Sequence, residues 1–428
     1  MTKATTTSDY VESLTARPRV DGKFLAIDQR RLLIKGVSYG TFVPDASGEQ
    51  YPSPSQITRD VAMMSGSGFN TIRTYTEPSS ALLDATANQG LRIIAGLPWS
   101  QHIPFLDDPK ALKKIRRNLV ESVRRLAAKP SLLMFAVGNE IPAGIVRWHG
   151  AKRIEHFLLD LYQDLKAAAP DHLFTYVNFP PTEHLDLECF DVCSFNVYLH
   201  RETELRAYLA RLHHIAGAKP LLLAEAGADS IRETPEGQAR LTTMQLKAAF
   251  TEGACGAVAY TWTDEWWRGG HEVNDWAFGL VDKNRDPKPA LAAVAQTLDQ
   301  APFPTIEQNK WPSVSVVVCA YNAADTLSDC LNSLQALIYP NFEIIVVNDG
   351  SSDTTAAIAR EQPNIRLIEV QNGGLSAARN AGLFAATGDL VAYTDADCRV
   401  DVDWLAYLVQ PMLTSSAVGV GGSNVVPQ

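Results

Sequence analysis

The 428-residue sequence predicts an α/β protein with two domains, a (β/α)8 TIM barrel followed by a smaller, Rossmann-like parallel-sheet domain. Three observations predict this architecture. Up to about residue 300, eight short apolar runs alternate with segments that carry apolar residues at helical spacing. Residues 299–312 hold three prolines and no periodicity, as an inter-domain linker does. A second alternation then begins, so we expect domains at 1–300 and 313–428 with a linker at 301–312.

The expected strands of the first domain are almost wholly apolar, as strands buried on both faces are. In order they are Leu32–Val37, Thr71–Tyr75, Leu91–Leu97, Leu133–Val137, Leu173–Val177, Val192–Val197, Leu221–Ala224 and Ala257–Trp262. Helical segments such as Leu112–Ala128, Ile154–Ala169 and Leu241–Glu252 lie between them. A doubly wound open sheet is the alternative, but it needs no eighth strand and normally carries a nucleotide-binding loop near its start. The pattern favours the barrel.

The second domain is expected to alternate strands and helices from its first residues onward. The expected strands are Ser315–Cys319, Phe342–Asn348, Ile365–Glu369 and Leu390–Thr394, and the expected helices are Thr326–Leu337, Thr354–Arg360 and Leu375–Ala386. This alternation predicts a second parallel sheet.

Composition and charge exclude several classes of protein. With 46% hydrophobic residues the chain can bury a large core, which excludes wholesale disorder. The net charge of −10 argues against a protein whose main partner is nucleic acid, because such proteins carry a dominant basic face. No apolar run approaches the roughly 18–20 residues of a membrane span. The six cysteines form no C-x-x-C pair, and the first 20 residues contain no signal-like apolar stretch, so we expect free thiols and a cytoplasmic location.

Two glutamates follow expected barrel strands and carry the chemistry of the first domain. Glu140 follows the fourth strand, in Gly-Asn-Glu, and Glu225 follows the seventh. The carboxyl ends of barrel strands meet around one cavity, so the two carboxylates are expected to face the same pocket. Cleavage of a glycosidic bond requires such a pair, one to protonate the leaving oxygen and one to attack or to activate water. Helix capping or salt bridging is the alternative role for each glutamate.

These residues resemble the retaining glycoside hydrolases of clan A, whose barrels include families 2 and 5. The resemblance covers about residues 20–298 and includes the opening strand Phe24–Gly36 and the segment Gly-Phe-Asn-Thr-Ile-Arg that ends at Arg73. It implies that Glu140 is the acid/base and Glu225 the nucleophile. It further implies that the sugar and the nucleophile are held by Arg73, Asn139, Asn196 and Tyr198, with Trp262 as the floor of subsite −1. No metal or cofactor is implied for the barrel.

Tryptophans are concentrated after the expected strands. Aromatic faces suit the C–H faces of pyranose rings, so these side chains are expected to line a sugar-binding cleft. Those on expected active-face loops are Trp99, Trp148, Trp262, Trp266, Trp267 and Trp276. We expect a β-linked glucan or oligosaccharide as substrate, with hydrolysis and transglycosylation equally compatible. A non-catalytic glycan-binding barrel is the alternative, which the presence of both glutamates argues against.

The second domain carries four motifs in order after its expected strands: Ala-Tyr-Asn, Asn-Asp-Gly-Ser-Ser-Asp, Asn-Gly-Gly-Leu-Ser-Ala-Ala-Arg-Asn and Asp-Ala-Asp. They resemble the nucleotide-binding half of family 2 glycosyltransferases, inverting enzymes with a GT-A fold. The resemblance implies a UDP-sugar site and Mn²⁺ or Mg²⁺ neutralising the diphosphate. The residues it implies for the nucleotide are Ala320, Tyr321, Asp349, Arg379 and Asp395, with Asp395 and Asp397 for the metal.

The family's catalytic acidic motif and its Gln-x-x-Arg-Trp acceptor segment do not occur after Asp397. We therefore expect this domain to bind a sugar nucleotide without transferring the sugar. We also expect the sequence to be part of a longer protein, truncated at its C-terminus. Membrane association, for instance at the inner membrane, is expected only through that further part.

Overall fold

The structure is a computed structural model that describes residue 14 and residues 16–28, 30–46, 48–303 and 310–422. The chain divides into two compact units, with the boundary between residues 304 and 305. This boundary falls within the expected linker 301–312, of which residues 304–309 lie outside the described residues. Each unit is described below by itself.

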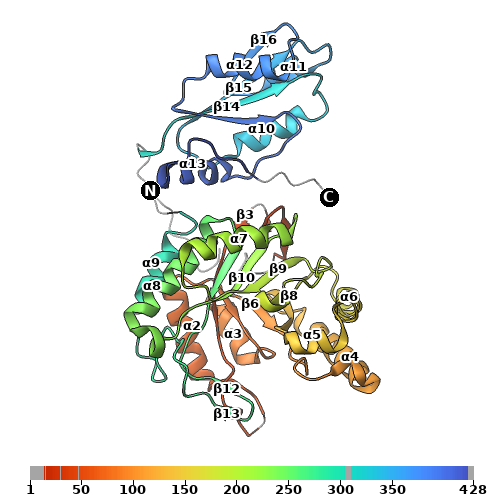
Figure 1. Ribbon diagram of the computed structural model, residues 1–428, viewed down its shortest axis with the longest axis vertical. Coiled ribbons are helices and arrows are strands. Elements are labelled where there is room, and N and C mark those ends of the chain that lie inside the picture. Colours follow the sequence, from red (N-terminus) through yellow and green to blue (C-terminus); the bar gives the residue numbers. More distant parts are fainter. Residues whose placement is uncertain (1–13, 15, 29, 47, 304–309, 423–428) are drawn as a thin grey trace. The chain divides into compact units, whose positions relative to one another are not determined.

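The first unit is a closed barrel of eight parallel strands, as expected (Figure 1). The strands run in the order β10-β11-β4-β5-β6-β7-β8-β9. Each strand pairs with the next barrel strand of the chain, and the pairing of β4 with β11 closes the barrel. Their bounds are β4 Ile34–Ser38, β5 Thr71–Arg73, β6 Arg92–Gly96, β7 Leu132–Asn139, β8 Leu173–Asn178, β9 Val192–Asn196, β10 Leu221–Ala226 and β11 Gly256–Ala259. Every expected barrel strand is present.

Helices cover the outside of the barrel because each has one apolar stripe. In α4 (Pro109–Leu126) the buried residues Ile115, Leu119, Val123 and Leu126 recur at helical spacing, and Asp108 caps the first turn by accepting the backbone N–H of Lys110. The other helices are α2 Pro54–Gly66, α3 Ser80–Asn88, α5 Ala143–His149, α6 Ala151–Ala168, α7 Glu202–Ala216, α8 Ser230–Thr251 and α9 Pro289–Asp299. Pro235 lies at a kink in α8, where Thr234 has a non-helical φ of 63°.

The opening segment is not one strand, and that expectation was wrong. Residues 24–36 divide into β2 (Phe24–Ile27), β3 (Arg30–Leu32) and the start of β4. Strands β1 (Pro18–Asp21), β2 and β3 form a small antiparallel sheet of their own. The chain reverses at Asp28, whose positive φ of 53° suits a short polar side chain.

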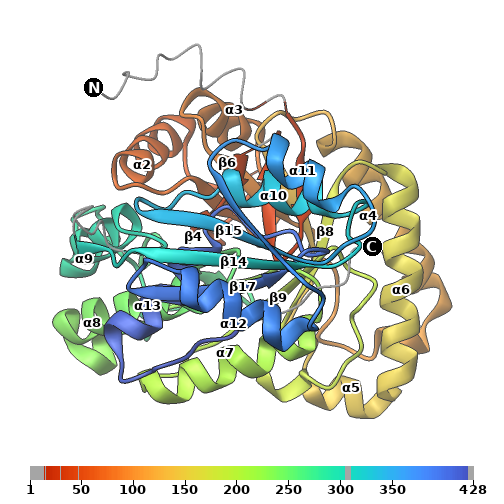
Figure 2. The same cartoon turned by 90° about the horizontal axis from the view of Figure 1, so that it is seen from above.

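The second unit is a four-stranded parallel sheet in the order β16-β15-β14-β17. The strands are β14 Val314–Ala320, β15 Phe342–Asp349, β16 Ile365–Val370 and β17 Leu390–Asp395, and the helices are α10 Leu327–Gln335, α11 Thr355–Glu361, α12 Leu375–Ala385 and α13 Trp404–Thr414. All seven expected elements are present. Alternate residues of β14 enter separate apolar clusters, Val316 and Val318 with α10 and α13, and Val317 with α12. Figure 2 shows β15, β14 and β17 of this sheet side by side.

Among the described residues, no helix combines the length and the hydropathy that crossing a membrane requires.

Candidate active site

Glu140 and Glu225 line one cleft of about 850 Å³ at the carboxyl ends of the barrel strands. Glu225 is the fifth residue of β10, and Glu140 comes directly after β7. Glu140 has a φ of 55°, in the left-handed region that a side chain with a Cβ rarely adopts, and its backbone N–H donates to Val177 O at 2.9 Å. Such backbone geometry is typical of functional sites, where the surrounding structure over-determines it. The expected juxtaposition of the two glutamates in one pocket is present.

Three donors hold the carboxylate of Glu225. Arg73 Nη1 donates to Oε1 at 2.8 Å, Tyr75 Oη donates to the same oxygen at 2.7 Å, and Tyr198 Oη donates to Oε2 at 2.6 Å. The arginine is almost fully buried, and the glutamate side chain is 8% exposed. A guanidinium and two phenols stabilise the ionised carboxylate and fix its orientation. Burial raises the pKa of both Tyr75 and Tyr198 well above its usual value, so both phenols stay protonated donors.

Glu140 has a different environment. Its Oε1 accepts one hydrogen bond, from Asn196 Nδ2 at 2.8 Å. Burial raises the pKa of this carboxyl group, and the negative charge of Glu225 raises it further. The surroundings of Glu140 therefore favour its protonated form more than water does.

Asn139 is oriented by two hydrogen-bond donors, one of which, Arg73, has no acceptor. Its Oδ1 accepts from Arg73 Nη2 at 2.7 Å and from Asn196 Nδ2 at 3.1 Å. A guanidinium has no acceptor, so the carbonyl of Asn139 must face it. The Nδ2 of Asn139 has no partner among the described residues, and Asn139 lines the cleft. Its N–H groups are free to donate to a hydroxyl in the cleft.

The aromatic lining agrees with the sequence in part. The expected Trp99, Trp266, Trp267 and Trp276 line the cleft, together with Tyr75, Tyr198, Tyr260 and Phe278. The expectation that Trp262 forms the floor of subsite −1 is not met, because its side chain is fully buried in the barrel core and does not line the cleft. The expectation that Trp148 lines the cleft is not met either. This residue of α5 is 68% exposed, lies outside the cleft lining and donates a hydrogen bond to the side chain of Asp107.

Sequence reasoning missed three residues of the site. Tyr75 binds Glu225, Gln101 accepts the backbone N–H of Asn139 at 3.0 Å, and Tyr260 lines the cleft. Tyr75 lies two residues after Arg73. Side chains two residues apart on an extended chain point to the same face, so the position of Arg73 could have indicated Tyr75. For Tyr260 the signal was misleading, because the expected strand ran to Trp262 whereas β11 ends at Ala259.

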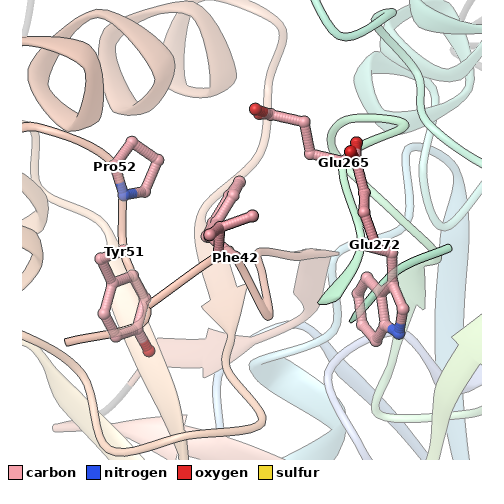
Figure 3. Close-up of a pocket in the computed structure, with 7 residues that line it drawn as sticks. Phe42, Tyr51, Pro52, Glu265 and Glu272 are labelled. Atoms are coloured by element: carbon pink, nitrogen blue, oxygen red, sulfur yellow. The ribbon is translucent and has the colours of Figure 1, made fainter. Parts of the chain in front are cut away.

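A smaller hollow of about 210 Å³ adjoins the cleft, and Trp266 lines both. Figure 3 shows Phe42, Tyr51 and Pro52 on one side of it and Glu265 and Glu272 on the other. Both carboxylates already pair with cations, Glu265 with Arg285 and Glu272 with Lys283, each at 2.6 Å. This hollow extends the aromatic surface beyond Glu140 and Glu225.

In the second unit, the expected nucleotide residues lie at the carboxyl edge of the sheet. Ala320 ends β14, Asp349 ends β15 and Asp395 ends β17, and ligands of open α/β sheets bind at this edge. Asp349 is buried, and its carboxylate accepts the backbone N–H groups of Gly373 at 2.8 Å and Gly374 at 2.9 Å. The carboxylate thus fixes the Asn-Gly-Gly turn that begins α12.

Apart from the buried Asp349, the charged residues of this edge reach solvent: the side chains of Arg379 and Asp395 are 43% and 55% exposed. Arg379 Nη2 pairs with Asp395 Oδ1 at 3.3 Å, and Asp397 lies two residues further, beyond the end of β17. Tyr321 is 56% exposed. Within the part of the chain that the structure describes, no three His, Cys, Asp or Glu side chains form a metal-binding group. Mg²⁺ and Mn²⁺ sites of this kind use one or two carboxylates plus substrate phosphates, and the Asp-Ala-Asp pair fits that donor set.

Comparison with known families agrees with both halves of this description. Residues 19–301 match the family model of the glycosyl hydrolases family 2, TIM barrel domain. The chain belongs to this family. Residues 315–428 match the glycosyl transferase family 2 model. The protein is a family 2 glycoside hydrolase barrel fused to a family 2 glycosyltransferase domain.

Solved structures share the barrel fold. A β-galacturonidase from Eisenbergiella tayi, bound to galacturonate, is 20% identical, with a TM-score of 0.53 over 66% of this chain and 54% of its own. The β-glucuronidase of Bifidobacterium dentium, complexed with coumarin-3-O-glucuronide, is 18% identical, with a TM-score of 0.58 over 68% of this chain and 50% of its own. At this identity the likeness establishes the fold alone.

Curated relatives match the second unit. The glycosyltransferase GlyA of Streptococcus pneumoniae is 38% identical over 113 residues, which are 25% of this chain and 16% of the relative. The poly-β-1,6-N-acetyl-D-glucosamine synthase of Staphylococcus aureus is 35% identical over 125 residues, which are 28% of this chain and 30% of the relative. The chain thus covers less than a third of the length of either relative.

Proposed function

We propose that the barrel cleaves or transfers a β-linked glucan or oligosaccharide by the retaining mechanism, with Glu225 as nucleophile and Glu140 as acid/base. The observation that carries this proposal is the difference between the surroundings of the two carboxyl groups. Three donors stabilise the ionised form of Glu225, whereas burial raises the pKa of Glu140. One ionised and one protonated carboxyl group are what a double displacement requires at its start.

In the first step Glu140 gives its proton to the glycosidic oxygen while Glu225 attacks the anomeric carbon. The bond between that carbon and the leaving oxygen breaks, and an ester bond to Glu225 forms. The leaving sugar departs as a neutral alcohol. The amide N–H groups of Asn139, which have no partner among the described residues, would donate to the 2-hydroxyl of the reacting sugar.

In the second step Glu140, now ionised, removes a proton from the acceptor, which attacks the anomeric carbon and releases Glu225. If the acceptor is water, the result is hydrolysis. If it is a sugar hydroxyl, the result is transglycosylation. The aromatic lining of Trp99, Trp266, Trp267 and Trp276 suits sugar rings on either side of the cleaved bond.

Substitution of each carboxylate tests this assignment. Glu225→Gln is expected to abolish turnover of aryl β-glycosides, and Glu140→Gln to lower it most for poor leaving groups, which need the proton. Glu233→Gln is the matched control, because Glu233 also lines the cleft but pairs with His200. Full activity in both catalytic-site variants would refute the assignment.

For the second unit we propose binding of a UDP-sugar at the carboxyl edge of the sheet. Asp395 and Asp397 would hold Mn²⁺ or Mg²⁺, which neutralises the diphosphate. Arg379 pairs with Asp395 at this edge, Tyr321 follows the end of β14, and Asp349 orders the Asn-Gly-Gly turn before α12. Calorimetry with UDP and Mn²⁺ is expected to detect binding that Asp395→Ala and Asp397→Ala weaken. Equal affinity in both variants would contradict the proposal.

A further inference from the structure

Strand β7 extends beyond its pairing with β6 at the carboxyl end of the barrel. The last residue pair between the two strands joins Gly96 and Ala136, whereas β7 continues to Asn139. A buried backbone amide or carbonyl without a partner costs free energy, so the end of β7 needs other partners on this side. For Asn139 they come from one side chain of the loop after β6, Gln101.

The amide of Gln101 binds both backbone groups of one residue. Its Oε1 accepts the N–H of Asn139 at 3.0 Å, and its Nε2 donates to the carbonyl oxygen of the same residue. The glutamine is 8% exposed, so little water competes for these bonds. Gly138 allows the amide to approach, because a Cβ there would lie 2.9 Å from Gln101 Oε1. A side-chain amide thus takes the place of a neighbouring strand.

These bonds fix the peptide group directly before Glu140. The carbonyl that Gln101 binds belongs to the peptide that joins Asn139 to Glu140. On the other side of the segment, Glu140 N donates to Val177 O of β8 at 2.9 Å. Between these contacts Glu140 has its φ of 55°, a conformation that a residue with a Cβ keeps only where its surroundings enforce it. Gln101 is part of those surroundings.

We propose that Gln101 is a positioning residue that holds Glu140 for proton transfer to the glycosidic oxygen. This inference rests on the proposed function. Proton transfer requires the acid to lie within hydrogen-bond reach of the leaving oxygen, so a small displacement slows it. Without the two bonds of Gln101, the peptide before Glu140 is free to rotate and the carboxyl group loses its fixed direction. Glu225 is held by other side chains, so it is expected to keep its place.

Gln101 also lines the cleft, so direct contact with the sugar is the alternative role. The two roles predict different results. A lost contact with the sugar slows every substrate of that sugar alike, whereas a displaced Glu140 slows only those substrates whose leaving group needs the proton. Dinitrophenol departs as a stable anion without protonation, and methoxyphenol does not.

The test measures kcat/KM of the 428-residue protein for two aryl β-glycosides of the same sugar, one with each leaving group. Gln101→Met, similar in length but without the amide, is expected to lower kcat/KM about 10- to 100-fold for the methoxyphenyl glycoside. For the dinitrophenyl glycoside it is expected to leave kcat/KM nearly unchanged. Gly138→Ala, whose Cβ would push the amide aside, is expected to act in the same direction, and it provides the test if Gln101→Met does not fold.

Asn70→Leu is the matched control. Asn70 makes a similar pair of bonds at the amino end of the barrel, where its Oδ1 accepts the N–H of Lys35 at 2.9 Å and its Nδ2 donates to Leu33 O at 2.8 Å. Its loss is expected to lower the free energy of unfolding, as Gln101→Met does, but to leave the ratio of the two kcat/KM values unchanged. The ratio is taken within one variant, so a partly unfolded fraction cancels.

Equal losses on the two glycosides in Gln101→Met, or an equal change of the ratio in Asn70→Leu, would overturn the inference and leave the proposed function standing. The proposed function is judged by Glu140→Gln, which is expected to lose most on the methoxyphenyl glycoside. If Glu140→Gln loses equally on both, or the unsubstituted protein cleaves neither, the acid/base assignment fails and the inference fails with it.

Discussion

Three side-chain donors hold the carboxylate of Glu225. Each of its two oxygens accepts a hydrogen bond from a phenol, Oε1 from Tyr75 and Oε2 from Tyr198. The buried guanidinium group of Arg73 forms an ion pair with Oε1. The face of Tyr75 also lies 4.6 Å from the guanidinium carbon of Arg73, so the tyrosine contacts both partners of the ion pair. The carboxylate of Glu225, the proposed nucleophile, is thus oriented before any substrate arrives.

Removing one phenol should weaken this orientation measurably. Tyr75→Phe and Tyr198→Phe each delete one hydrogen bond to a charged group, which is worth about 1.5–3 kcal/mol. We expect each variant to lose roughly 10- to 100-fold in kcat/KM on aryl β-glycosides. Tyr162→Phe is the matched control, because it removes a phenol–carboxylate bond to Asp191 remote from the cleft lining. If Tyr75→Phe loses no more activity than this control, Tyr75 is not a positioning residue.

The pH profile reports on Glu140. The amide of Asn196 donates to the ionised carboxylate and holds its pKa down against burial, so Asn196→Ala is expected to raise the pKa of Glu140 further. A higher pKa keeps the acid protonated to higher pH. The basic limb of kcat/KM should therefore move to higher pH in Asn196→Ala and disappear in Glu140→Gln. A basic limb that moves to lower pH, or persists in Glu140→Gln, would contradict the assignment.

At the scale of residues, the sequence predicted the polar residues around Glu225 better than the aromatic residues that line the cleft. Arg73, Asn139 and Tyr198 were assigned from motifs, and each takes part in the hydrogen-bond network around Glu225. The tryptophans depended on where strands and helices end. Trp262 turns into the core because β11 stops earlier than its apolar run, and Trp148 lies on the outer face of the short helix α5. Apolar patterns do not fix such boundaries to one residue.

At the scale of elements, glycines allow the strand ends to approach. A Cβ on Gly96, the last residue of β6, would lie 2.4 Å from Thr74 O and 2.8 Å from Tyr75 Cα. These are backbone atoms, so they cannot turn aside. The segment that presents Tyr75 to Glu225 is therefore packed directly against β6.

Gly96→Ala should accordingly affect both stability and activity. Overpacking of this kind costs about 1–3 kcal/mol, and we expect a lower free energy of unfolding together with weakened catalysis, because Tyr75 must shift. Gly144→Ala in α5 is the matched control, since a Cβ there meets nothing within 4 Å. Chemical denaturation and aryl glycoside kinetics measure the two effects. Unchanged stability in Gly96→Ala would contradict the packing described.

The elements themselves follow closely from the sequence. The eight barrel strands are buried on both faces, which makes them continuous apolar runs that stand out from amphipathic helices. The segment 24–36 was misread as one strand, although four polar residues, Asp-Gln-Arg-Arg, interrupt its apolar residues at 28–31 and the chain reverses at Asp28, which has a positive φ. Backbone conformation at a single position leaves no periodic signal.

At the scale of the whole molecule, two carbohydrate-active domains stand in one chain, each with its own hydrophobic core. A ligand that binds one folded unit stabilises that unit by mass action. UDP with Mn²⁺ at about 100 times the dissociation constant should raise the free energy of unfolding of the second unit by about 2.7 kcal/mol. Scanning calorimetry measures this as a higher Tm. Asp395→Ala should reduce the shift, and a full shift in this variant would exclude Asp395 from the site.

The central claim is that Glu225 forms the covalent bond to the sugar. A 2-fluoro β-glycoside with a good leaving group tests it most directly, because the fluorine slows release of the glycosyl-enzyme more than a normal sugar does. Mass spectrometry of the digested protein should find one added fluoro-sugar on the peptide that contains Glu225, and none in Glu225→Gln. Labelling of Glu140 or another residue, or turnover of β-glycosides with inversion at the anomeric carbon, would contradict the account.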